Sequence, residues 1–482
     1  MHLEQDPLLG YPEIFRKSFA GIIGQGTPLF VAGGPVRDWL FGKKANDLDL
    51  AVGGNGVEVA RYFAGRTGGA FVLLDDEEGV ARVVTGGIAV DFAGFREGTT
   101  TIQADLRLRD FTINSMAIAL SHEGGLAEPY ELIDPLDGLT DLNQKIIRAP
   151  SLETFQNDPL RLLRAFRFAG AIGGTIEPRT EVWIRELIPL VTRPSPERIR
   201  YELDLIISQD HPDRTFAQLA EMGLLGALFP ELRAGEGMDQ PSSHHLDVFQ
   251  HNLAALAAMV KILDGPADYF PNRSADLKEY LSQAGHRSWL KWAALFHDLG
   301  KPTTCAIRSD GRTTFYNHDR VGGGIFQQIG SRYRMSREAI RLVRLLIELH
   351  MWPFHLNNAN QKIGITPKAC LRLVKAAGDD LPGLFLLAMA DSISAQGPNK
   401  PKEMEDNLAL LYDHIDQVRR EKVMPVLTGP PLVTGHDLKE FGLQPGPLFR
   451  TILEKIEQAR VEDQIHDRAE ALLWVEQFLT KS

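Results

Sequence analysis

The sequence predicts a multidomain α+β protein in which a small mixed α/β head is followed by an all-helical remainder. Its 482 residues suffice for about three or four domains of roughly 100–200 residues each. Up to about residue 150, apolar runs rich in β-branched residues alternate with helical patterns. Beyond that point apolar residues recur at helical spacing, and we find no convincing strand pairs.

The elements expected in the head follow from its apolar runs and turn residues. Gly86-Gly87 separates two β-rich runs, which is typical of a hairpin. The predicted strands are Leu29–Ala32, Leu48–Val52, Ala81–Thr85 and Ile88–Phe92, and the predicted helices are Pro35–Phe41 and Val57–Arg66.

Three segments, most of them rich in Gly, Pro and polar residues, mark candidate domain boundaries. They are Arg148–Ser151, 234–243 and 395–402. The expected parts are a head over 1–150, a helical neck over 151–233, a His-rich helical domain over 234–395 and a helical tail over 396–482.

Charge gives two opposing indications about nucleic acid. The formal net charge is −11, whereas nucleic-acid-binding domains usually display a basic surface. A basic strip on an acidic body can still follow a phosphate backbone. The arginines that form such a strip are Arg161, Arg164, Arg167, Arg179, Arg185, Arg193, Arg198 and Arg200.

Other features predict a cytoplasmic protein without a membrane partner. Cys305 and Cys370 form no CxxC pair, which argues against a cysteine zinc site or a disulfide framework. The N-terminus lacks the basic and long apolar regions of a secretory signal. The longest apolar stretches, such as the one ending at Ala390, span about ten residues, roughly half of a membrane span. No pattern indicates an oligomeric state.

A candidate magnesium site lies in the second predicted strand. Asp47 and Asp49 alternate along it, so their carboxylates project from one face. Neighbouring carboxylates repel unless a cation neutralises them, and Mg²⁺ takes one or two carboxylates plus substrate phosphates. An isolated Asp-x-Asp is usually structural, but Asp91, mid-strand among apolar residues, offers a third carboxylate. Together they predict two-metal phosphoryl transfer, with Asp91 nearest the attacking hydroxyl.

The glycine pair before the first predicted helix is expected to bind phosphate. Without Cβ atoms, Gly33 and Gly34 let backbone N–H groups approach a triphosphate at the positive end of that helix. Arg37 adds a charged fork to the same place.

Residues 28–230 resemble the class II CCA-adding enzyme and bacterial poly(A) polymerase family. Its first motif corresponds to GGPVRD followed by DLD. The other four correspond to LRLRDFTINSMAI (106–118), DPLDGLTDLNQKIIRA (134–149), NDPLRLLRAFRFAG (157–170) and PERIRYEL (196–203).

The resemblance implies a nucleotidyltransferase head in which Gly34 and Arg37 bind the triphosphate and Asp47 and Asp49 hold magnesium. It also implies that Arg109, Asp158, Arg161, Arg164 and Arg167 complete the nucleotide site. Two positions depart from the family pattern. Asn157 stands where Glu is usual, which affects the positioning of the selecting helix, and Leu108 replaces a second basic residue, which weakens a phosphate contact.

Base selection without a template is predicted for Asp158 and Arg161, which are three residues apart on an expected helix. A carboxylate accepts hydrogen bonds and a guanidinium donates them. Such a pair fits the amino donor and ring-nitrogen acceptor of cytosine and adenine. Arg167 would lie nearly opposite Asp158, which favours a phosphate, RNA or structural role. The ordinary alternative is a solvated amphipathic helix with ion pairs.

The length of one segment predicts which nucleotide is added. Relatives that add the terminal A usually carry a longer flexible segment before the second motif, whereas only EGTTTIQADLRL separates Arg96 from Arg109. This favours addition of two cytidines to the tRNA 3′ end from CTP. The first alternative is full CCA addition from CTP and ATP. An A-adding enzyme or a bacterial poly(A) polymerase is less favoured, the polymerase because a strongly basic tail is missing.

A second constellation, of His and Asp residues, lies within helical patterns between residues 244 and 391. Imidazole and carboxylate ligands suit divalent transition metals. A single helical His is usually structural, but an adjacent His-Asp pair with distant His and Asp partners is a stronger signal. The candidate ligands are His251, His297, Asp298, His318, His350 and Asp391.

These ligands resemble those of an HD-type phosphohydrolase domain in its two-metal form. The resemblance implies hydrolysis of 2′,3′-cyclic phosphates or 2′-phosphates at RNA ends, with Lys301 contacting phosphate. The alternative is a retained fold that only supports tRNA. The tail resembles the C-terminal part of the CCA-adding family and is expected to contact RNA. Two further hypotheses, an RNA-end phosphohydrolase with a binding-only head and a non-catalytic RNA-binding protein, are disfavoured by the three head carboxylates.

Overall fold

The computed structural model describes residues 5–45, 47–76 and 78–481. Two compact units make up the chain, one formed by residues 1–206 and 221–227 and the other by 207–220 and 228–482. The predicted fold class, a mixed α/β head followed by helical parts, is confirmed. The finer division into four parts stays a prediction. Across the described residues, every helix is too short or too polar to span a bilayer.

A seven-stranded mixed sheet forms the core of the first unit, in the order β3-β4-β5-β2-β1-β6-β7. Only β2 and β5 pair in parallel within it. The register aligns Arg82 of β4 with Asp91 of β5, and Asp91 with Asp49 of β2. The strands are β1 (Leu29–Ala32), β2 (Asp47–Val52), β3 (Ala70–Asp75), β4 (Val80–Thr85), β5 (Ile88–Gly94), β6 (Ala117–Ala119) and β7 (Leu132–Ile133).

The four predicted strands correspond to β1, β2, β4 and β5, and the two predicted helices to α2 (Gly34–Leu40) and α3 (Gly56–Thr67). Three strands of the sheet, β3, β6 and β7, were not predicted. The expectation that no strands pair beyond residue 150 is wrong, because β10 (Ala306–Ile307) pairs with β11 (Thr313–Thr314). A second small sheet joins β9 (Thr175–Ile176) to β8 (Ile146–Ile147), which lies just before residue 150.

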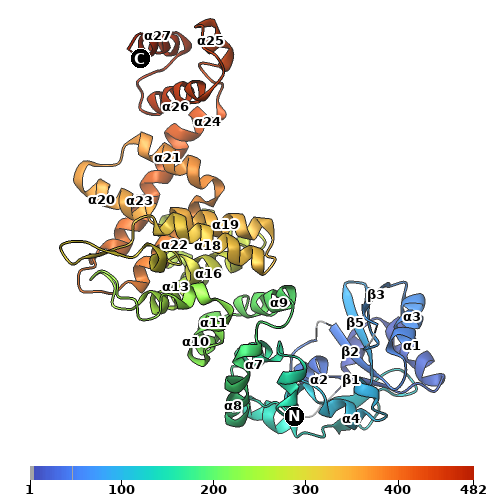
Figure 1. Ribbon diagram of the computed structural model, residues 1–482. Helices are drawn as coiled ribbons and strands as arrows, with labels where there is room; N and C mark the ends of the chain where they lie inside the picture. The colour runs from blue at the N-terminus through green and yellow to red at the C-terminus, as the bar shows by residue number, and fades with distance from the viewer. Residues whose placement is uncertain (1–4, 46, 77, 482) are drawn as a thin grey trace. The chain divides into compact units, whose positions relative to one another are not determined.

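An aromatic layer holds one face of the sheet against α1 (Glu13–Gly24) and α3, which lie side by side in Figure 1. The ring of Phe63 lies 5.1 Å from that of Phe15 and 5.2 Å from that of Phe92, measured between centroids. Because side chains alternate along a strand, Phe92 faces this layer and its neighbour Asp91 faces the opposite side of the sheet.

A helical segment follows the sheet within the first unit. Its central helix α7 (Arg161–Ile172) buries Leu162, Leu163, Ala165 and Phe166 almost completely. These residues form the apolar face of the helix, whereas Arg164 and Arg167 on it form ion pairs with acidic residues. The other helices of the unit are α4 (Ile102–Arg107), α5 (Gly138–Gln144), α6 (Glu153–Asn157), α8 (Pro178–Leu187), α9 (Pro196–Ile207) and α11 (Leu224–Leu228).

The second unit is helical. The buried helix α22 (Leu381–Ser394) packs against α13 (Val248–Asp264) and α16 (His286–Phe296), and α18 (His318–Arg332) pairs with α19 (Arg337–Leu349). The remaining helices here are α10 (Pro212–Met222), α12 (Pro230–Arg233), α14 (Pro266–Tyr269), α15 (Ser274–Ser282), α17 (Lys301–Thr304), α20 (Trp352–Ile363), α21 (Pro367–Ala377), α23 (Met404–Val418) and α24 (Met424–Thr428).

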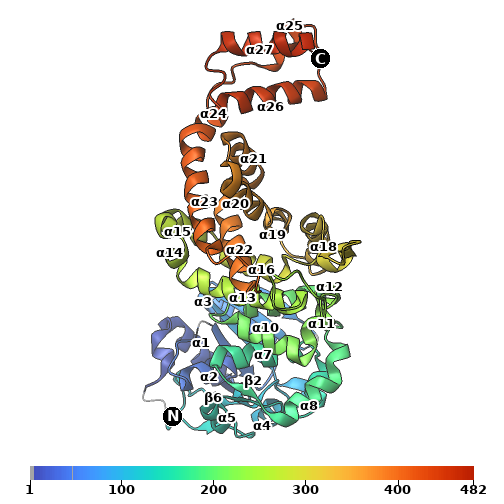
Figure 2. The same cartoon turned by 90° about the vertical axis from the view of Figure 1, so that its left-hand side faces the viewer.

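The C-terminal end of the second unit has a small core of its own. Leu438, Ile452 and Val475 are completely buried within it. They come from α25 (Gly435–Glu440), α26 (Pro447–Val461) and α27 (Arg468–Lys481), which Figure 2 shows together.

Candidate active site of the head and candidate metal centre

A cavity of about 450 Å³ opens in the first unit and collects most of the predicted head residues. Asp91 is the exception, since it is not among the described residues that line the cavity. The lining also includes residues that were not predicted, among them Asp110, Phe168 and Glu202. The predicted residues in the lining are Gly33, Gly34, Arg37, Asp47, Asp49, Arg109, Asp158, Arg161, Arg164 and Arg167.

The two carboxylates of β2 reach this cavity together, as their alternation predicts. Burial, with the nearby charges of Asp91 and Asp47, raises the pKa of Asp49 to about 6. The positive charges of Arg109 and Arg82 act in the opposite direction but do not cancel this shift. Paired carboxylate oxygens that repel each other fit a divalent cation such as Mg²⁺.

The glycine pair brings the backbone close to these charged groups. Gly33 has φ +75°, and a Cβ there would lie 2.8 Å from an Arg109 guanidinium nitrogen. A Cβ at Gly34 would lie 3.6 Å from Asp49 Oδ2. The absence of both side chains leaves room for a ligand beside the carboxylate.

Asp91 is not the unpartnered strand carboxylate that the sequence suggested. Arg82 Nε donates to its Oδ1 at 2.7 Å, and a terminal guanidinium nitrogen of Arg82 donates to Oδ2 at 2.8 Å. Because these residues face each other across the hairpin at Gly86-Gly87, counting outward from that turn identifies the pair. Arg82 is thus a functional candidate that the sequence contained and the prediction missed.

Two cavity arginines are positioned by one buried carboxylate, Asp105, which also was not predicted. Its side chain is fully buried. It accepts hydrogen bonds from Arg96 at 2.9 Å and from Arg109 at 3.2 Å, and from the Arg96 backbone N–H at 3.0 Å. Asp105 therefore fixes the direction in which both guanidiniums reach the cavity.

Asp105→Ala is expected to lower the free energy of unfolding of the first unit by about 3–5 kcal/mol, because it leaves the buried Arg109 guanidinium without its partner. Urea denaturation followed by tryptophan fluorescence would measure the change. The exposed Asp76 allows a matched control, Asp76→Ala, for which less than about 0.5 kcal/mol is expected. Equal stability of the two variants would contradict this role.

Asp158 and Arg161 do not share a helix, which corrects the sequence prediction. Asp158 ends α6 with an extended backbone (φ −139°, ψ 94°), and α7 begins at Arg161. The helical angle between Asp158 and Arg167 therefore does not apply, and both side chains line the same cavity. Asp158 is held by Arg198, whose guanidinium lies 2.8 Å from Oδ2.

Arg164 and Arg167 of α7 are held in place by acidic side chains and by an aromatic ring. Arg164 donates to Asp110 Oδ2 at 2.5 and 3.0 Å, and Arg167 Nε lies 2.7 Å from Glu202 Oε2. Burial alone would raise the pKa of Asp110, but Arg164 lowers it well below its ordinary value. The guanidinium of Arg167 lies 4.1 Å from the centre of the Phe168 ring. These contacts orient cationic groups that would otherwise repel each other.

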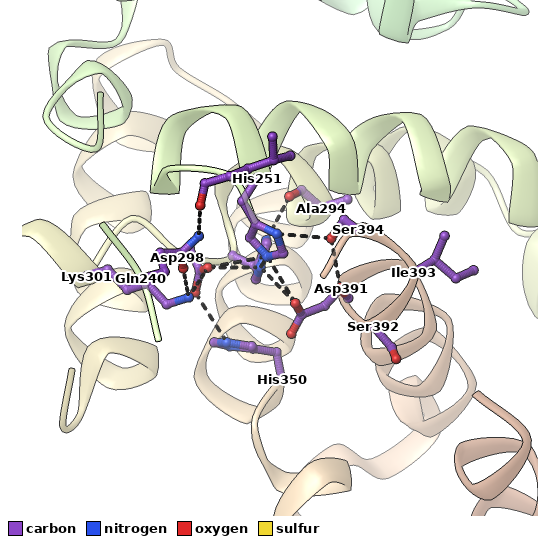
Figure 3. Close-up of polar contacts among 12 residues, drawn as sticks. Gln240, His251, Ala294, Asp298, Lys301, His350, Asp391, Ser392, Ile393 and Ser394 are labelled. Atoms are coloured by element: carbon purple, nitrogen blue, oxygen red, sulfur yellow. Dashed lines mark hydrogen bonds and ion pairs between the residues drawn. The ribbon is translucent and has the colours of Figure 1, made fainter. Parts of the chain in front are cut away.

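All six predicted ligands of the second constellation meet in the second unit. Figure 3 shows four of them, His251, Asp298, His350 and Asp391, pointing toward one another. His251, His297 and Asp298 form one group whose ligand atoms lie within 4.8 Å of one another, and Asp298, His318 and His350 form another. Asp391 Oδ1 lies 3.1 Å from His251 Nε2 and 3.6 Å from His297 Nε2. They come from α13, the end of α16, α18, the end of α19, and α22.

Hydrogen bonds to the other ring nitrogens show which atoms face the centre. His297 Nδ1 lies 2.9 Å from the carbonyl oxygen of Ala294, and His350 Nδ1 lies 2.7 Å from that of Ile347. A carbonyl only accepts, so each Nδ1 carries a proton. The Ser394 hydroxyl donates its proton to the backbone oxygen of Asp391, so it accepts a hydrogen bond from His251 Nδ1 at 3.2 Å. His251 Nδ1 therefore carries a proton, as do the Nδ1 atoms of His297 and His350.

The Nε2 atoms of the histidines lie close to one another at this centre. His251 and His297 place their Nε2 atoms 3.2 Å apart, as do His318 and His350. Burial lowers the pKa of His251, and lowers that of His350 to about 3, so these two rings are neutral at pH 7. Burial alone would also lower the pKa of His297, but the carboxylates of Asp298 and Asp391 raise it to about 10. Imidazole nitrogens that converge with two buried carboxylates fit a metal site, where a bound cation would take the place of the His297 proton.

Three further residues belong to the surroundings of this centre. Lys301, the predicted phosphate contact, lies with Nζ 2.5 Å from Asp298 Oδ2 and 2.6 Å from Gln240 Oε1. The His244 ring packs 4.6 Å from that of His251. Gln240 and His244 were not predicted, and no spacing rule connects them to the His-Asp pair.

A relative from Deinococcus radiodurans named A-adding tRNA nucleotidyltransferase is 32% identical over 455 residues, covering 93% of this chain and 95% of the relative. This chain belongs to the tRNA nucleotidyltransferase family. Its residues 29–148 match the poly A polymerase head domain, 174–235 match a probable RNA and SrmB-binding site of polymerase A, and 248–419 match the HD domain.

Other tRNA nucleotidyltransferases are similar over most of the chain or over part of it. A CC-adding enzyme from Thermus thermophilus is 28% identical and covers 92% of both chains. A CC-adding enzyme from Geobacter sulfurreducens is 40% identical over 206 residues, which are 42% of this chain and 46% of the relative. A CCA-adding enzyme solved with CTP shares the fold at a TM-score of 0.65, with 23% identity and coverage of 99% and 100%.

Proposed function

We propose that this tRNA nucleotidyltransferase adds two cytidines from CTP to the tRNA 3′ end. The observation that carries this specificity is the short, folded segment between β5 and the second motif. Within it Arg96 forms a turn whose guanidinium and backbone bind Asp105, and α4 follows directly. This segment is shorter and more firmly anchored than the flexible segment expected in relatives that add the terminal A.

The head cavity supports a single displacement. The 3′ oxygen of the RNA bonds to the α-phosphorus of CTP, the bond to pyrophosphate breaks, and the hydroxyl proton leaves to solvent. Asp47 and Asp49 would hold Mg²⁺, which when bound supplies positive charge for the triphosphate and lowers the pKa of the attacking hydroxyl. Gly33, Gly34 and Arg37 border the same space and orient the phosphates. Arg109, Arg164 and Arg167 contribute further positive charge.

Asp91 has a supporting role in this proposal. Its pairing with Arg82 and its place outside the cavity lining favour an electrostatic influence on Asp49 over direct contact with the hydroxyl. Arg82, Asp91 and Asp49 are aligned on adjacent strands, so the charges of Arg82 and Asp91 act on the carboxylate of Asp49.

Asp158 and Arg161 read the incoming base in this proposal, supported by their shared place at the cavity. Asp158→Ala is expected to reduce the preference for CTP over UTP by about 10–100-fold, since one buried hydrogen-bond partner is worth about 1–3 kcal/mol. Single-turnover kcat/KM values for the two nucleotides would measure it. Undiminished preference would remove Asp158 from base selection, and Asp76→Ala serves as the control.

The decisive experiment on specificity uses purified protein and three tRNAs, ending before CCA, in C and in CC. CTP, ATP or both are supplied, and products are sized at single-nucleotide resolution. Two additions from CTP and none from ATP support the proposal. The full-length similarity to an A-adding enzyme favours a second candidate, which predicts a single addition of A to the tRNA ending in CC. Three additions ending in A would establish full CCA synthesis.

The second unit is proposed to hydrolyse phosphate esters with a divalent transition metal. The converging Nε2 atoms of its histidines, together with the carboxylates of Asp298 and Asp391, support metal binding. His251, His297, Asp298, His318, His350 and Asp391 would hold the metal, which when bound supplies an activated water. RNA ending in a 2′,3′-cyclic phosphate or a 2′-phosphate is the test substrate, with and without a chelator. Unchanged RNA ends at every metal tested would overturn this activity.

A further inference from the structure

The metal centre of the second unit lies in a pocket of about 600 Å³ that is larger than a phosphate group requires. Asp298, His318 and Asp391 of the centre line this pocket. Small-molecule sites usually measure about 300–1,000 Å³, so the space accommodates a whole nucleotide. The rest of the lining therefore carries information about the ligand.

Apolar and aromatic side chains dominate the remaining wall. Tyr316 and Phe315 follow strand β11, and Met351 and Phe354 lie at the start of α20. Tyr316 is 70% exposed, so its aromatic ring is available to a ligand. A simple phosphate monoester has no flat apolar group that could contact these side chains. A nucleobase has one, and stacking it on an aromatic ring contributes binding free energy.

Cationic and polar groups lie at the same pocket nearer the metal ligands. Lys301 is 7% exposed and fixed between Asp298 and Gln240. His244 lines the pocket beside His251. The same pocket thus has charged groups suited to a phosphate ester and apolar side chains suited to a flat ring.

We propose that this pocket binds a ribonucleotide, with its phosphate ester at the His and Asp centre and its base against the wall formed by Tyr316 and Phe354. The inference rests on the hydrolytic function proposed above and adds the base as a recognised part of the substrate. The same chemistry occurs in a free mononucleotide and in the 3′-terminal nucleotide of an RNA, so both forms enter the test.

The test measures binding through base stacking. The probe is 2-aminopurine riboside 3′-phosphorothioate, whose fluorescence is quenched on stacking. A second probe is a short RNA with the same nucleotide at its 3′ end. Full-length, metal-loaded protein is used, with Asp158→Ala and Arg161→Ala in every sample so that the head does not read the base. Metal content is checked for each variant.

Quenching is expected with the parent protein, and Tyr316→Ala and Phe354→Ala should each weaken binding about tenfold or more. Tyr316→Phe keeps the ring and should bind like the parent. Phe441→Ala, which removes a 37% exposed ring outside the pocket, is the matched control. The probe whose quenching shows this pattern identifies the source, free nucleotide or RNA end.

Equal binding by Tyr316→Ala, Phe354→Ala and the parent would overturn the proposal, as would equally strong competition by ribose 5-phosphate, which has no base. A second readout separates this failure from failure of the hydrolytic function. Cleavage of p-nitrophenyl phosphate with no effect of either variant on nucleotide binding overturns only the base site. Variant-sensitive quenching without cleavage of any phosphate ester overturns only the hydrolase activity.

Discussion

Asp49→Asn is expected to reduce nucleotide addition to tRNA by at least about 1,000-fold. The substitution keeps the size of the side chain but removes the charge that balances a divalent cation. Metal assistance is worth several kcal/mol of transition-state stabilisation, and each 1.36 kcal/mol corresponds to a tenfold change in rate. Incorporation of radiolabelled CTP into tRNA lacking CCA, under single-turnover conditions, measures the loss.

Asp76→Asn is the matched control, because Asp76 is an exposed carboxylate of the same unit. It should add nucleotides at the parental rate. Binding of Mn²⁺, followed by electron paramagnetic resonance in the presence of CTP, should weaken for Asp49→Asn alone. Addition within tenfold of the parent would contradict the assignment of Asp49 to the metal site.

His297→Ala is expected to weaken transition-metal binding by the second unit at least about 100-fold and to leave nucleotide addition unchanged. Loss of a group that only orients a ligand costs about 10–100-fold, and His297 is itself a predicted ligand. Inductively coupled plasma mass spectrometry of the dialysed protein measures metal content. Hydrolysis of 2′,3′-cyclic RNA ends should disappear in parallel.

His414→Ala is the control for this prediction, since His414 is exposed on α23. It should keep both metal content and hydrolysis. A parental metal content in His297→Ala would contradict the predicted ligand set, even if hydrolysis were lost. Loss of nucleotide addition in His297→Ala would show that the two functions are not separable.

Local patterns in the sequence predicted the strands that carry the head carboxylates. Alternation of Asp47 and Asp49 indicated their shared face, and Gly86-Gly87 indicated the hairpin that pairs β4 with β5. β3 was not predicted because its run, FVLL, lacks alternation, and its Val72, Leu73 and Leu74 are exposed at the edge of the sheet. β6 and β7 are too short to show a period.

Side-chain partnerships were harder to predict than ligands. The six His and Asp residues were predicted as ligands because an adjacent His-Asp pair with distant His and Asp partners suits a metal. By contrast, Asp105 resembles any helical acid in sequence, and only its complete burial between Arg96 and Arg109 reveals its role. The helix expected to join Asp158 and Arg161 was wrong because Asp158 takes an extended backbone conformation between α6 and α7.

The backbone at Gly33 restricts how this head can change over evolution or in the laboratory. An added methyl group would meet two penalties at once, an unfavourable torsion and displacement of the Arg109 guanidinium. Displacing the Arg109 guanidinium would also disturb its hydrogen bond to Asp105, the carboxylate that Arg96 shares. Libraries designed to alter nucleotide preference should therefore hold this one codon constant and vary the opposite wall of the cavity.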